Sequence, residues 1–388
     1  MDLNSLIQEL QCFGPEIAES YCIVNGAFMK LAELQNMGYD EFSLRSKMNM
    51  PLKLYKYFPN KTIHPLKATA GEAQTVNYSL QALKNNTVYM QSPSLFDDVY
   101  DSDIHLNYAD YEKCSLLYYC KQCELNVTST MSAQELGDTL LHHIGQCFNS
   151  TGNFDDVFRK KPASEAEELL NKIFLLGLQS KLIKSGTWNT AIARVIIDEY
   201  KDFSHRLQNT FRMTCFTTTP YSQLMWGGAY ANCHHGFCLE YTVLPNDPQY
   251  EGVYLNLFPM IYCKTRPNMT EKLVKLQNKE ISQNDLWNIY FHGALRKSID
   301  WAYQNEWRLL LPFRLNKTGV DYNVPFFPIT KVYLGNRMSP ESREEIIKIC
   351  HCKNIPYVGV TRNPNIFEMQ ECPVQCESCP NYISKANQ

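Results

Sequence analysis

The sequence predicts an α+β protein, with a mixed β-sheet core that carries N-terminal helices and a helical insertion. In residues 1–50 and again in 106–209, apolar side chains recur at spacings of three and four, the period of an amphipathic helix. Short segments rich in aromatic and β-branched residues lie between and after these stretches, bounded by proline or asparagine. Residues 331–360 close the pattern with a strand, a helix and a strand. Together these observations indicate helices and strands that share one core.

The N-terminal region, residues 1–50, is expected to be helical. Pro15 suits the first position of a helix. An apolar stripe then follows at spacings of three and four, formed by Ile17, Tyr21, Val24, Phe28 and Leu31. We interpret this region as a helical addition to the core.

The core is expected to span residues 51–370, with a helical insertion at about 106–209 in which Ser164 and Glu167 form a capping box. The expected strands are 54–58, 87–92, 212–218, 236–243, 306–311, 331–334 and 356–360. The expected helices outside the insertion are a short one around 78–83, one at 223–231, two between 269 and 299, and one that begins at Ser339–Pro340. Residues 371–388 form a cysteine-rich C-terminal tail.

The composition is that of a packed globular protein. The 388 residues are 44% hydrophobic and 20% charged, and 37 basic against 40 acidic side chains give a net charge of −3. This balance excludes a general nucleic-acid binder. Apolar runs such as 173–176 are far shorter than the ~20 residues of a membrane helix. The first residues show no secretory signal, so we expect a cytoplasmic protein with no membrane partner.

Fifteen cysteines are an odd number, and cytosolic thiols are kept reduced, so free thiols are expected along the chain. The C-terminal cysteines could also hold a structural zinc ion, because Cys376 and Cys379 have the spacing of a zinc hairpin. Cys350 and Cys352 are spaced too closely for such a hairpin. Reduced thiols are therefore favoured over zinc.

The segment Tyr55-Lys56-Tyr57 is the first that combines residue types suited to a ligand. In an alternating strand the two tyrosines share one face and Lys56 points to the other. The segment is either a ligand-binding strand or an edge strand with a solvated lysine.

The second such segment begins at Ser92 and contains the carboxylates of Asp97, Asp98 and Asp101. A loop of this kind after a strand can bind a hard cation or the hydroxyls of a ribose. Its spacing is not that of an EF-hand, and a solvated acidic loop is the simpler interpretation.

The third segment, 225–240, places Trp226 and Tyr230 four residues apart, so a helix would carry both on one face. Such a pair can stack on a planar ring, although aromatic pairs at this spacing also fill protein cores. His234 follows at the expected junction between helix and strand.

The fourth segment contains Gln304, Glu306 and Arg308, which project to the same side if 304–311 is a strand. Three polar side chains on one face of an otherwise apolar strand suggest a site at the mouth of the sheet. The alternative is a surface salt bridge between Glu306 and Arg308.

Taken in order, these segments resemble a bacterial family known as domain of unknown function 2971. Its members carry Tyr-Lys-Tyr, then Ser-x-Pro-x-x-Phe-Asn-Asp-Pro-x-Asp, then Met-Trp-x-x-Tyr-Ala-x-x-His-x-Gly-x-Cys, and finally Trp-x-Tyr-Glu-x-Glu-x-Arg. The resemblance extends from about residue 53 to residue 370. Three positions depart from the pattern, because Asp97 replaces an asparagine, Val99 a proline and Gln304 a glutamate.

The layout is also similar to that of ADP-ribosyltransferases, which place a carboxylate on a late strand. This resemblance implies an NAD-using ADP-ribosyltransferase or NAD glycohydrolase of the toxin or phage-defence kind, with its acceptor left open. The implied catalytic residues are Glu306, Gln304 and Ser92, or the strand end Thr217–Thr219 in place of Ser92. The implied binding residues for NAD, as the substrate, are Tyr55, Lys56, Tyr57, Trp226, Tyr230, His234 and Arg308.

Two other interpretations stay open. A metal-dependent hydrolase or nuclease would use Asp97, Asp98, Asp101, Glu240 and Glu306. A non-enzymatic module would bind a nucleotide in an aromatic pocket and contact partners through its helices. The enzymatic interpretation requires one cleft to bring together Glu306, Lys56, Ser92, Trp226 and Tyr230.

Overall fold

The computed structural model describes residues 19–61, 76–96, 98, 100–103, 106–151, 201, 205, 208–209, 211–266, 268–277, 280–312 and 322–372. The predicted capping box at Ser164 and most of the cysteine-rich tail lie outside these ranges. The chain divides into two compact units. The first, the sheet unit, comprises 1–101, 209–265 and 295–388, and the second, the helical unit, comprises 102–208 and 266–294.

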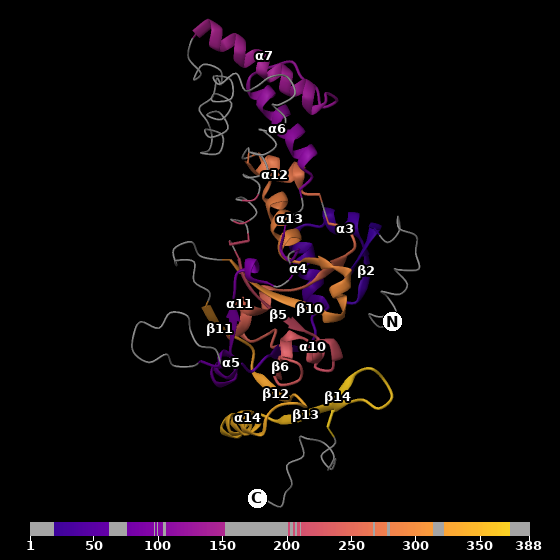
Figure 1. The fold of residues 1–388 in the computed structure, drawn as a ribbon, viewed down its shortest axis with the longest axis vertical. Helices are drawn as coiled ribbons and strands as arrows, with labels where there is room; N and C mark the ends of the chain where they lie inside the picture. The colour runs from indigo at the N-terminus through magenta and orange to yellow at the C-terminus, as the bar shows by residue number, and fades with distance from the viewer. Residues whose placement is uncertain are drawn as a thin grey trace, which may run out of the picture. The chain divides into compact units, whose positions relative to one another are not determined.

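The sheet unit is built around an eight-stranded mixed sheet with the strand order β14-β13-β12-β6-β3-β5-β10-β7 (Figure 1). Its strands are β3 (Lys53–Phe58), β5 (Phe211–Thr217), β6 (Phe237–Thr242), β7 (Leu257–Pro259), β10 (Glu306–Pro312), β12 (Ile329–Leu334), β13 (Tyr357–Arg362) and β14 (Met369–Glu371). β12 and β13 are parallel because α14 (Pro340–Lys353) connects them, and the other neighbours are antiparallel. The predicted α+β class with a mixed sheet is confirmed.

Two smaller sheets complete the strands of this unit. One has the order β2-β1-β8-β9, and the other pairs β11 with β4. Their bounds are β1 (Tyr21–Val24), β2 (Ala27–Lys30), β4 (Thr87–Met90), β8 (Ile261–Cys263), β9 (Arg296–Ser298) and β11 (Tyr322–Pro325). The other helices and 3-10 turns of the unit are α3 (Leu31–Asn36), α4 (Tyr39–Met48), α5 (Tyr78–Asn85), η1 (Pro93–Leu95), α10 (Gln223–Gly227), η2 (Ala229–Ala231), η3 (Pro248–Tyr250), α11 (Glu251–Leu255) and η4 (Ile299–Gln304).

The N-terminal region departs from its prediction. Residues 21–30, expected to be helical, form the antiparallel hairpin of β1 and β2. Asn25 and Gly26 both have positive φ, 49° and 74°, as a two-residue hairpin turn requires. The Asn-Gly pair between two aromatic and β-branched runs therefore overrides the helical spacing. Helices α3 and α4 begin only after the hairpin.

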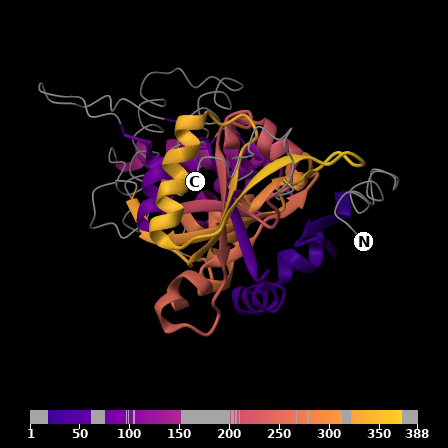
Figure 2. The same cartoon turned by 90° about the horizontal axis from the view of Figure 1, so that it is seen from below.

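The large sheet has two chemically different faces. One, the core face, carries the apolar side chains of its strands, including Leu54, Phe216, Leu239 and Trp307, and packs against α5 and α14. Figures 1 and 2 both show α14 beside β12 and β13. The opposite face, the polar face, carries alternate residues of the same strands. Strand alternation therefore separates the main core of the unit from a surface that can bear polar chemistry.

The helical unit contains α6 (Tyr108–Gln122), α7 (Ala133–Thr151), α12 (Thr270–Gln277) and α13 (Gln283–Ala294). The Asn107 side chain caps α6 by accepting from the N–H groups of Ala109 and Asp110. A separate core holds the unit together, formed by residues such as Leu116, Cys120, Leu136, Leu140, Leu273 and Ile289. Two helices expected in the sheet-bearing core, α12 and α13, thus belong to the same unit as the helices expected in the insertion.

Within the described ranges, no helix combines the length and the apolar character that a membrane crossing needs. Ten cysteines of these ranges are free thiols, as predicted. Cys372 departs from that expectation, because it is disulfide-bonded. Cys350 and Cys352 both belong to α14, where Cys350 is buried on the side that faces the core and Cys352 is exposed, so they do not face a common site.

Candidate active site

A row of four side chains crosses the polar face of the large sheet. Tyr55 on β3 lies opposite Glu240 on β6 and, on its other side, opposite Thr217 on β5. Thr217 in turn lies opposite Glu306 on β10. The register of four strands thus places two carboxylates, a tyrosine and a threonine in one line.

The sheet opens next to this row. β3 and β5 are paired only where Tyr55 meets Thr217, so their backbones separate beyond that point. The Lys56 ammonium enters the gap and donates to Thr214 Oγ1 at 2.8 Å and to the carbonyl oxygen of Cys215 at 3.0 Å. A half-buried lysine therefore satisfies a backbone acceptor beside the gap between the two strands.

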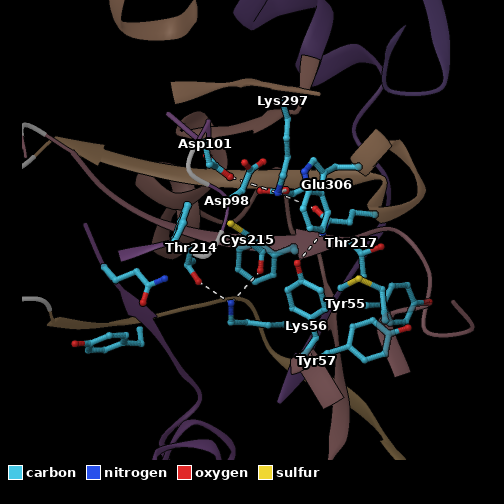
Figure 3. A pocket seen from close by; sticks show the side chains of 18 of the residues that line it. Tyr55, Lys56, Tyr57, Asp98, Asp101, Thr214, Cys215, Thr217, Lys297 and Glu306 are labelled. Atoms are coloured by element: carbon cyan, nitrogen blue, oxygen red, sulfur yellow. Dashed lines mark hydrogen bonds and ion pairs between the residues drawn. The ribbon is translucent and has the colours of Figure 1, made fainter. Parts of the chain in front are cut away.

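A cavity of about 440 Å³ lies where the strands separate (Figure 3). Its aromatic walls suit a planar or sugar ligand, while carboxylates and amides project into it. The lining residues are Tyr55, Lys56, Tyr57, Tyr89, Gln91, Leu95, Phe96, Asp98, Asp101, Thr214, Cys215, Phe216, Thr217, Met225, Tyr230, Lys297, Trp301, Gln304 and Glu306. All of them belong to the sheet unit.

A buried network of two cations and two carboxylates forms one end of the cavity. Arg308 binds Asp101 through both terminal nitrogens, at 2.7 and 2.6 Å, and donates from Nε to Glu306 Oε1 at 2.5 Å. Lys297 lies 3.1 Å from Glu306 Oε2 and 3.3 Å from Asp101 Oδ2. All four side chains are at most 7% exposed, so the two pairs of opposite charges balance one another away from solvent.

This network fixes the charge of Glu306. Burial alone would raise the pKa of this carboxyl, but Arg308 and Lys297 outweigh burial and lower it to about 2. The same carboxylates raise the pKa of Lys297 against the effect of burial. Glu306 is therefore an ionised carboxylate at neutral pH, in the wall of a cavity that is also lined by aromatic side chains.

Gln304 extends the network toward the aromatic wall. Its Oε1 accepts from Lys297 Nζ at 2.9 Å, and its Nε2 donates to the Tyr230 hydroxyl at 2.7 Å. The Lys297 ammonium also lies 5.1 Å from the Trp301 ring centre, within the range of a cation–π contact. Lys297 thus joins Glu306, Gln304 and Trp301 into one rigid group.

A second buried carboxylate lies behind the cavity. Glu240 accepts from Lys53 at 2.8 Å and Thr330 at 2.9 Å through Oε1, and from the hydroxyls of Tyr55 and Tyr333 at 3.2 and 2.9 Å through Oε2. Burial would raise the pKa of Glu240, but these hydrogen bonds lower it below its ordinary value. Glu240 does not line the cavity and orients Tyr55, which does.

Three more titratable groups of the cavity, Lys56, Cys215 and Tyr230, have pKa values shifted toward their neutral forms. Burial lowers the pKa of Lys56. Burial, reinforced by Glu306, raises the pKa of the Cys215 thiol to about 12, and burial raises that of Tyr230 to about 12. Cys215 is therefore a protonated thiol at neutral pH and not an activated nucleophile.

The structure brings most of the residues singled out in the sequence to this cavity. Those that line it are Tyr55, Lys56, Tyr57, Tyr230, Gln304 and Glu306. Gln304 ends the 3-10 turn η4 instead of lying in the strand, which begins at Glu306, yet it still joins the site. Glu306 and Arg308 do share one face, as alternation predicts, but their contact is buried and not a surface salt bridge.

The remaining residues lie elsewhere. Arg308 is 0% exposed and stands behind Glu306 as its counter-ion. Ser92 is buried and hydrogen-bonds to Ser94 and Asn209. Of the five residues required to share one cleft, Glu306, Lys56 and Tyr230 do so, whereas Ser92 and Trp226 do not line the cavity.

Trp226 supports the cavity wall from behind. Its ring is 0% exposed, and its indole N–H donates to the Pro220 carbonyl oxygen at 2.7 Å. Tyr57 meets this ring edge-on at 5.1 Å between centres, and His234 stacks on it at 6.3 Å. The predicted pair of Trp226 and Tyr230 therefore does not enclose a ligand, because only Tyr230 faces the cavity.

A tight turn that contains His234 accounts for the remaining residues of the third sequence segment, 225–240. Asn232, Cys233 and His234 all have positive φ, between 49° and 71°, which is costly for side chains other than glycine. A Cβ on Gly236 would lie 2.0 Å from the Phe58 carbonyl oxygen. The motif thus provides a tight turn that seats Trp226 against Tyr57.

Lys297 and Cys215 belong to the site but were not expected from the sequence, whereas Trp301 is the first residue of the last sequence motif. Lys297 lies in a short strand after α13 with no motif around it, and its role depends on the pairing of β8 with β9. No pattern in a single sequence marks such a residue. Asp98 and Asp101 had been considered as residues that bind a cation or the hydroxyls of a ribose, and Glu240 as a possible metal ligand.

The metal alternative finds little support in this geometry. Asp101 and Glu306 already have cationic partners, and Glu240 belongs to a separate cluster. Among the described residues, no group of three or more histidine, cysteine or acidic side chains is arranged to hold a metal ion. Asp97 lies outside the described residues.

Comparison with known families bears on the same segment. Residues 225–309 match the family model described as protein of unknown function (DUF2971). This segment begins at Met225, beside Trp226, and includes Lys297, Gln304, Glu306 and Arg308, so it contains much of the site. The match supports the resemblance seen in the sequence motifs. Comparisons with curated proteins and with solved structures found no match.

Proposed function

We propose that the cavity binds NAD and that the protein transfers its ADP-ribose group to an acceptor or to water. The observation that carries this proposal is Glu306, an ionised carboxylate at the wall of an aromatic cavity whose pKa is lowered to about 2. Few chemistries need a fixed buried negative charge beside planar surfaces. Cleavage of an N-glycosidic bond to a cationic ring is one of them.

In this reaction the bond between the ribose C1′ and the nicotinamide nitrogen breaks, and its electron pair leaves with nicotinamide. The ribose becomes an oxocarbenium-like cation, which a nearby carboxylate stabilises more strongly than it stabilises the substrate. A nucleophile then forms the new bond to C1′ and loses its proton, which passes to solvent when the nucleophile is water. Glu306 would supply the negative charge that stabilises this cation and would accept a hydrogen bond from a ribose hydroxyl.

The surrounding residues support this assignment. Each oxygen of Glu306 has one cationic partner, Arg308 or Lys297, and a carboxylate oxygen can accept a second hydrogen bond. Tyr55, Tyr57, Tyr230 and Trp301 supply the aromatic surfaces that a nicotinamide or adenine ring would need. Because Lys297 and Gln304 are already hydrogen-bonded to the network, Glu306 would need little reorganisation during the reaction.

The test is release of nicotinamide from NAD labelled in that ring, measured with and without cell extract. We expect the wild-type protein to release nicotinamide and Glu306→Gln to reduce the rate by at least ~100-fold, as loss of one preorganised electrostatic group typically does. Glu344→Gln, on the exposed surface of α14, is the matched control and should keep full activity. Circular dichroism would confirm that both variants are folded.

A second label on the adenine separates the possible outcomes. Label in free ADP-ribose indicates hydrolysis, and label bound to macromolecules indicates transfer. Wild-type protein that binds NAD without releasing nicotinamide under either condition would favour the nucleotide-sensing module over the enzyme. No binding and no turnover would rule out both.

A further inference from the structure

Among the described residues that line the cavity, Asp98 is the one carboxylate that the buried network leaves unsatisfied. Its Oδ1 accepts from the Tyr100 N–H at 2.9 Å, but its Oδ2 is buried and has no hydrogen-bond partner among the described residues. Asp98 lines the cavity, and Figure 3 shows it at the end where Asp101, Lys297 and Glu306 lie. A buried carboxylate oxygen without a donor is costly, and such groups often mark where a ligand binds.

The cations of the network cannot supply this donor in the observed arrangement. The Lys297 ammonium has three hydrogens and three oxygen partners, on Asp101, Gln304 and Glu306. The Arg308 guanidinium is shared between Asp101 and Glu306. Three carboxylates therefore share two cations at this end of the cavity, and Lys56, which also lines the cavity, donates to Thr214 and Cys215 instead.

This surplus of carboxylates over cations limits what can bind there. A phosphate group would be repelled, because it would bring further negative charge beside Asp98 and Glu306. A neutral group with hydroxyl donors would instead satisfy the free oxygen, and a ribose offers two such donors on neighbouring carbons. The aromatic lining would accept the flat face of the sugar or the ring attached to it.

We propose that Asp98 Oδ2 accepts a hydrogen bond from a hydroxyl of the same ribose that Glu306 contacts. Asp98 is then a specificity-determining residue, which selects a nucleotide that presents a ribose with free 2′- and 3′-hydroxyls at this end of the cavity. This inference rests on the nucleotide binding in the proposed function, but not on turnover. The two carboxylates would hold the ribose from two elements, the loop after η1 and strand β10.

Calorimetric titration of the full chain with ADP-ribose and with ADP tests this assignment, because ADP lacks the second ribose. Asp98→Asn keeps the Oδ1 acceptor for Tyr100 but replaces the charged oxygen by an amide. We expect this variant to bind ADP-ribose about 10- to 100-fold more weakly, the range for a hydrogen bond to a charged group, and ADP with unchanged affinity. Asp40→Asn, at an exposed position in α4, is the control and should bind both ligands normally.

The melting temperature without ligand provides a second readout. Asp98→Asn removes a buried charge that lacks a partner, so it should leave the melting temperature unchanged or raise it. A fall of several degrees would show that Asp98 serves the fold of its loop and would overturn the inference. Stabilisation of the wild type by Mg²⁺ alone, lost in Asp98→Asn, would also overturn it in favour of a cation site.

The outcomes distinguish this inference from the proposed reaction. Weaker ADP-ribose binding by Asp98→Asn supports the inference even if the wild type leaves NAD intact. Equal ADP-ribose affinities for the variant and the wild type would refute it, even if NAD is cleaved. Failure of the wild type to bind ADP-ribose would refute it as well.

Discussion

Glu306 and Arg308 stand two residues apart on one face of β10, with Arg308 Nε 2.5 Å from Glu306 Oε1. The guanidinium is 0% exposed and its other nitrogens bind Asp101, so it cannot reach into the cavity. Arg308 was expected to bind the ligand, whereas its position makes it the counter-ion that keeps Glu306 ionised. The site therefore depends on an electrostatic network whose members can be tested one at a time.

Stability should depend on the ionisation of Glu306. Its folded-state pKa, about 2, is below the ordinary value of 4.5, so the ionised carboxylate stabilises the fold above pH 4.5. This contribution, at most roughly 3 kcal/mol, is lost as the pH falls from 4.5 toward 2. We expect the difference in unfolding free energy between wild type and Glu306→Gln to be constant from pH 7 to 5 and to shrink between pH 4.5 and 3. Urea denaturation at several pH values measures this difference, and a difference that does not change with pH would contradict the assigned pKa shift.

Lys297 should be essential to the same network. Lys297→Met leaves Asp101 and Glu306 with Arg308 alone, and it removes the donor to Gln304. Because breaking a buried ion pair leaves an uncompensated charge, we expect a loss of about 3–5 kcal/mol in unfolding free energy. Nicotinamide release should fall as well, since Glu306 loses part of its support. Lys348→Met removes an exposed ion pair on α14 and serves as the control, which should unfold like the wild type. Equal stability of the two variants would show that the network contributes nothing.

Much of the sheet could be predicted from the sequence because its strands are short runs of apolar and aromatic residues that end at prolines or turn residues. β3, β5, β6, β10, β12 and β13 all lie within a few residues of their predicted positions. The two faces of β10 were also predictable, since alternation alone places Glu306 with Arg308. Such alternation is visible in the sequence because successive side chains of a strand point to opposite faces of the sheet.

The parts that could not be predicted depend on contacts between distant segments. Lys297 reaches Glu306 only because β8 pairs with β9, and no sequence pattern near Lys297 predicts that pairing. Trp226 and Tyr230 have helical spacing, but the helix ends at Gly227 and a 3-10 turn follows. Tyr230 therefore turns into the cavity while Trp226 stays in the core.

Trp226 should affect stability more than ligand binding. Trp226→Phe keeps an aromatic ring but loses the hydrogen bond to Pro220 and part of the packing on Tyr57. We expect a loss of about 1–2 kcal/mol in unfolding free energy, and only a few-fold change in NAD affinity. Tyr230→Ala should instead weaken NAD binding and leave the unfolding free energy nearly unchanged, because this side chain is 37% exposed and lines the cavity. Urea denaturation measures the stability of both variants, and calorimetric titration measures their affinity for NAD. A Trp226→Phe variant that is as stable as the wild type but binds NAD more weakly would contradict this prediction.

Lys47, remote from the cavity, should make the protein less stable at neutral and acidic pH. Its ammonium donates to the Leu257 carbonyl oxygen and lies 4.4 Å from the centre of the Phe258 ring, and burial lowers its pKa from 10.5 to about 7. Between pH 7 and 10.5 the folded state binds fewer protons than the unfolded state, so wild-type stability rises with pH in this range.

Lys47→Met should remove this dependence. We expect the variant to be more stable than the wild type by about 1–2 kcal/mol at pH 6, an advantage that declines as the pH rises from 7 toward 10.5, where the amine of the unfolded state also loses its proton. Urea denaturation at pH 6, 8 and 10 measures the trend, with Lys348→Met as the exposed control. A Lys47→Met variant that is less stable at every pH would mean that the contacts of the ammonium with Leu257 and Phe258 outweigh the cost of burying it.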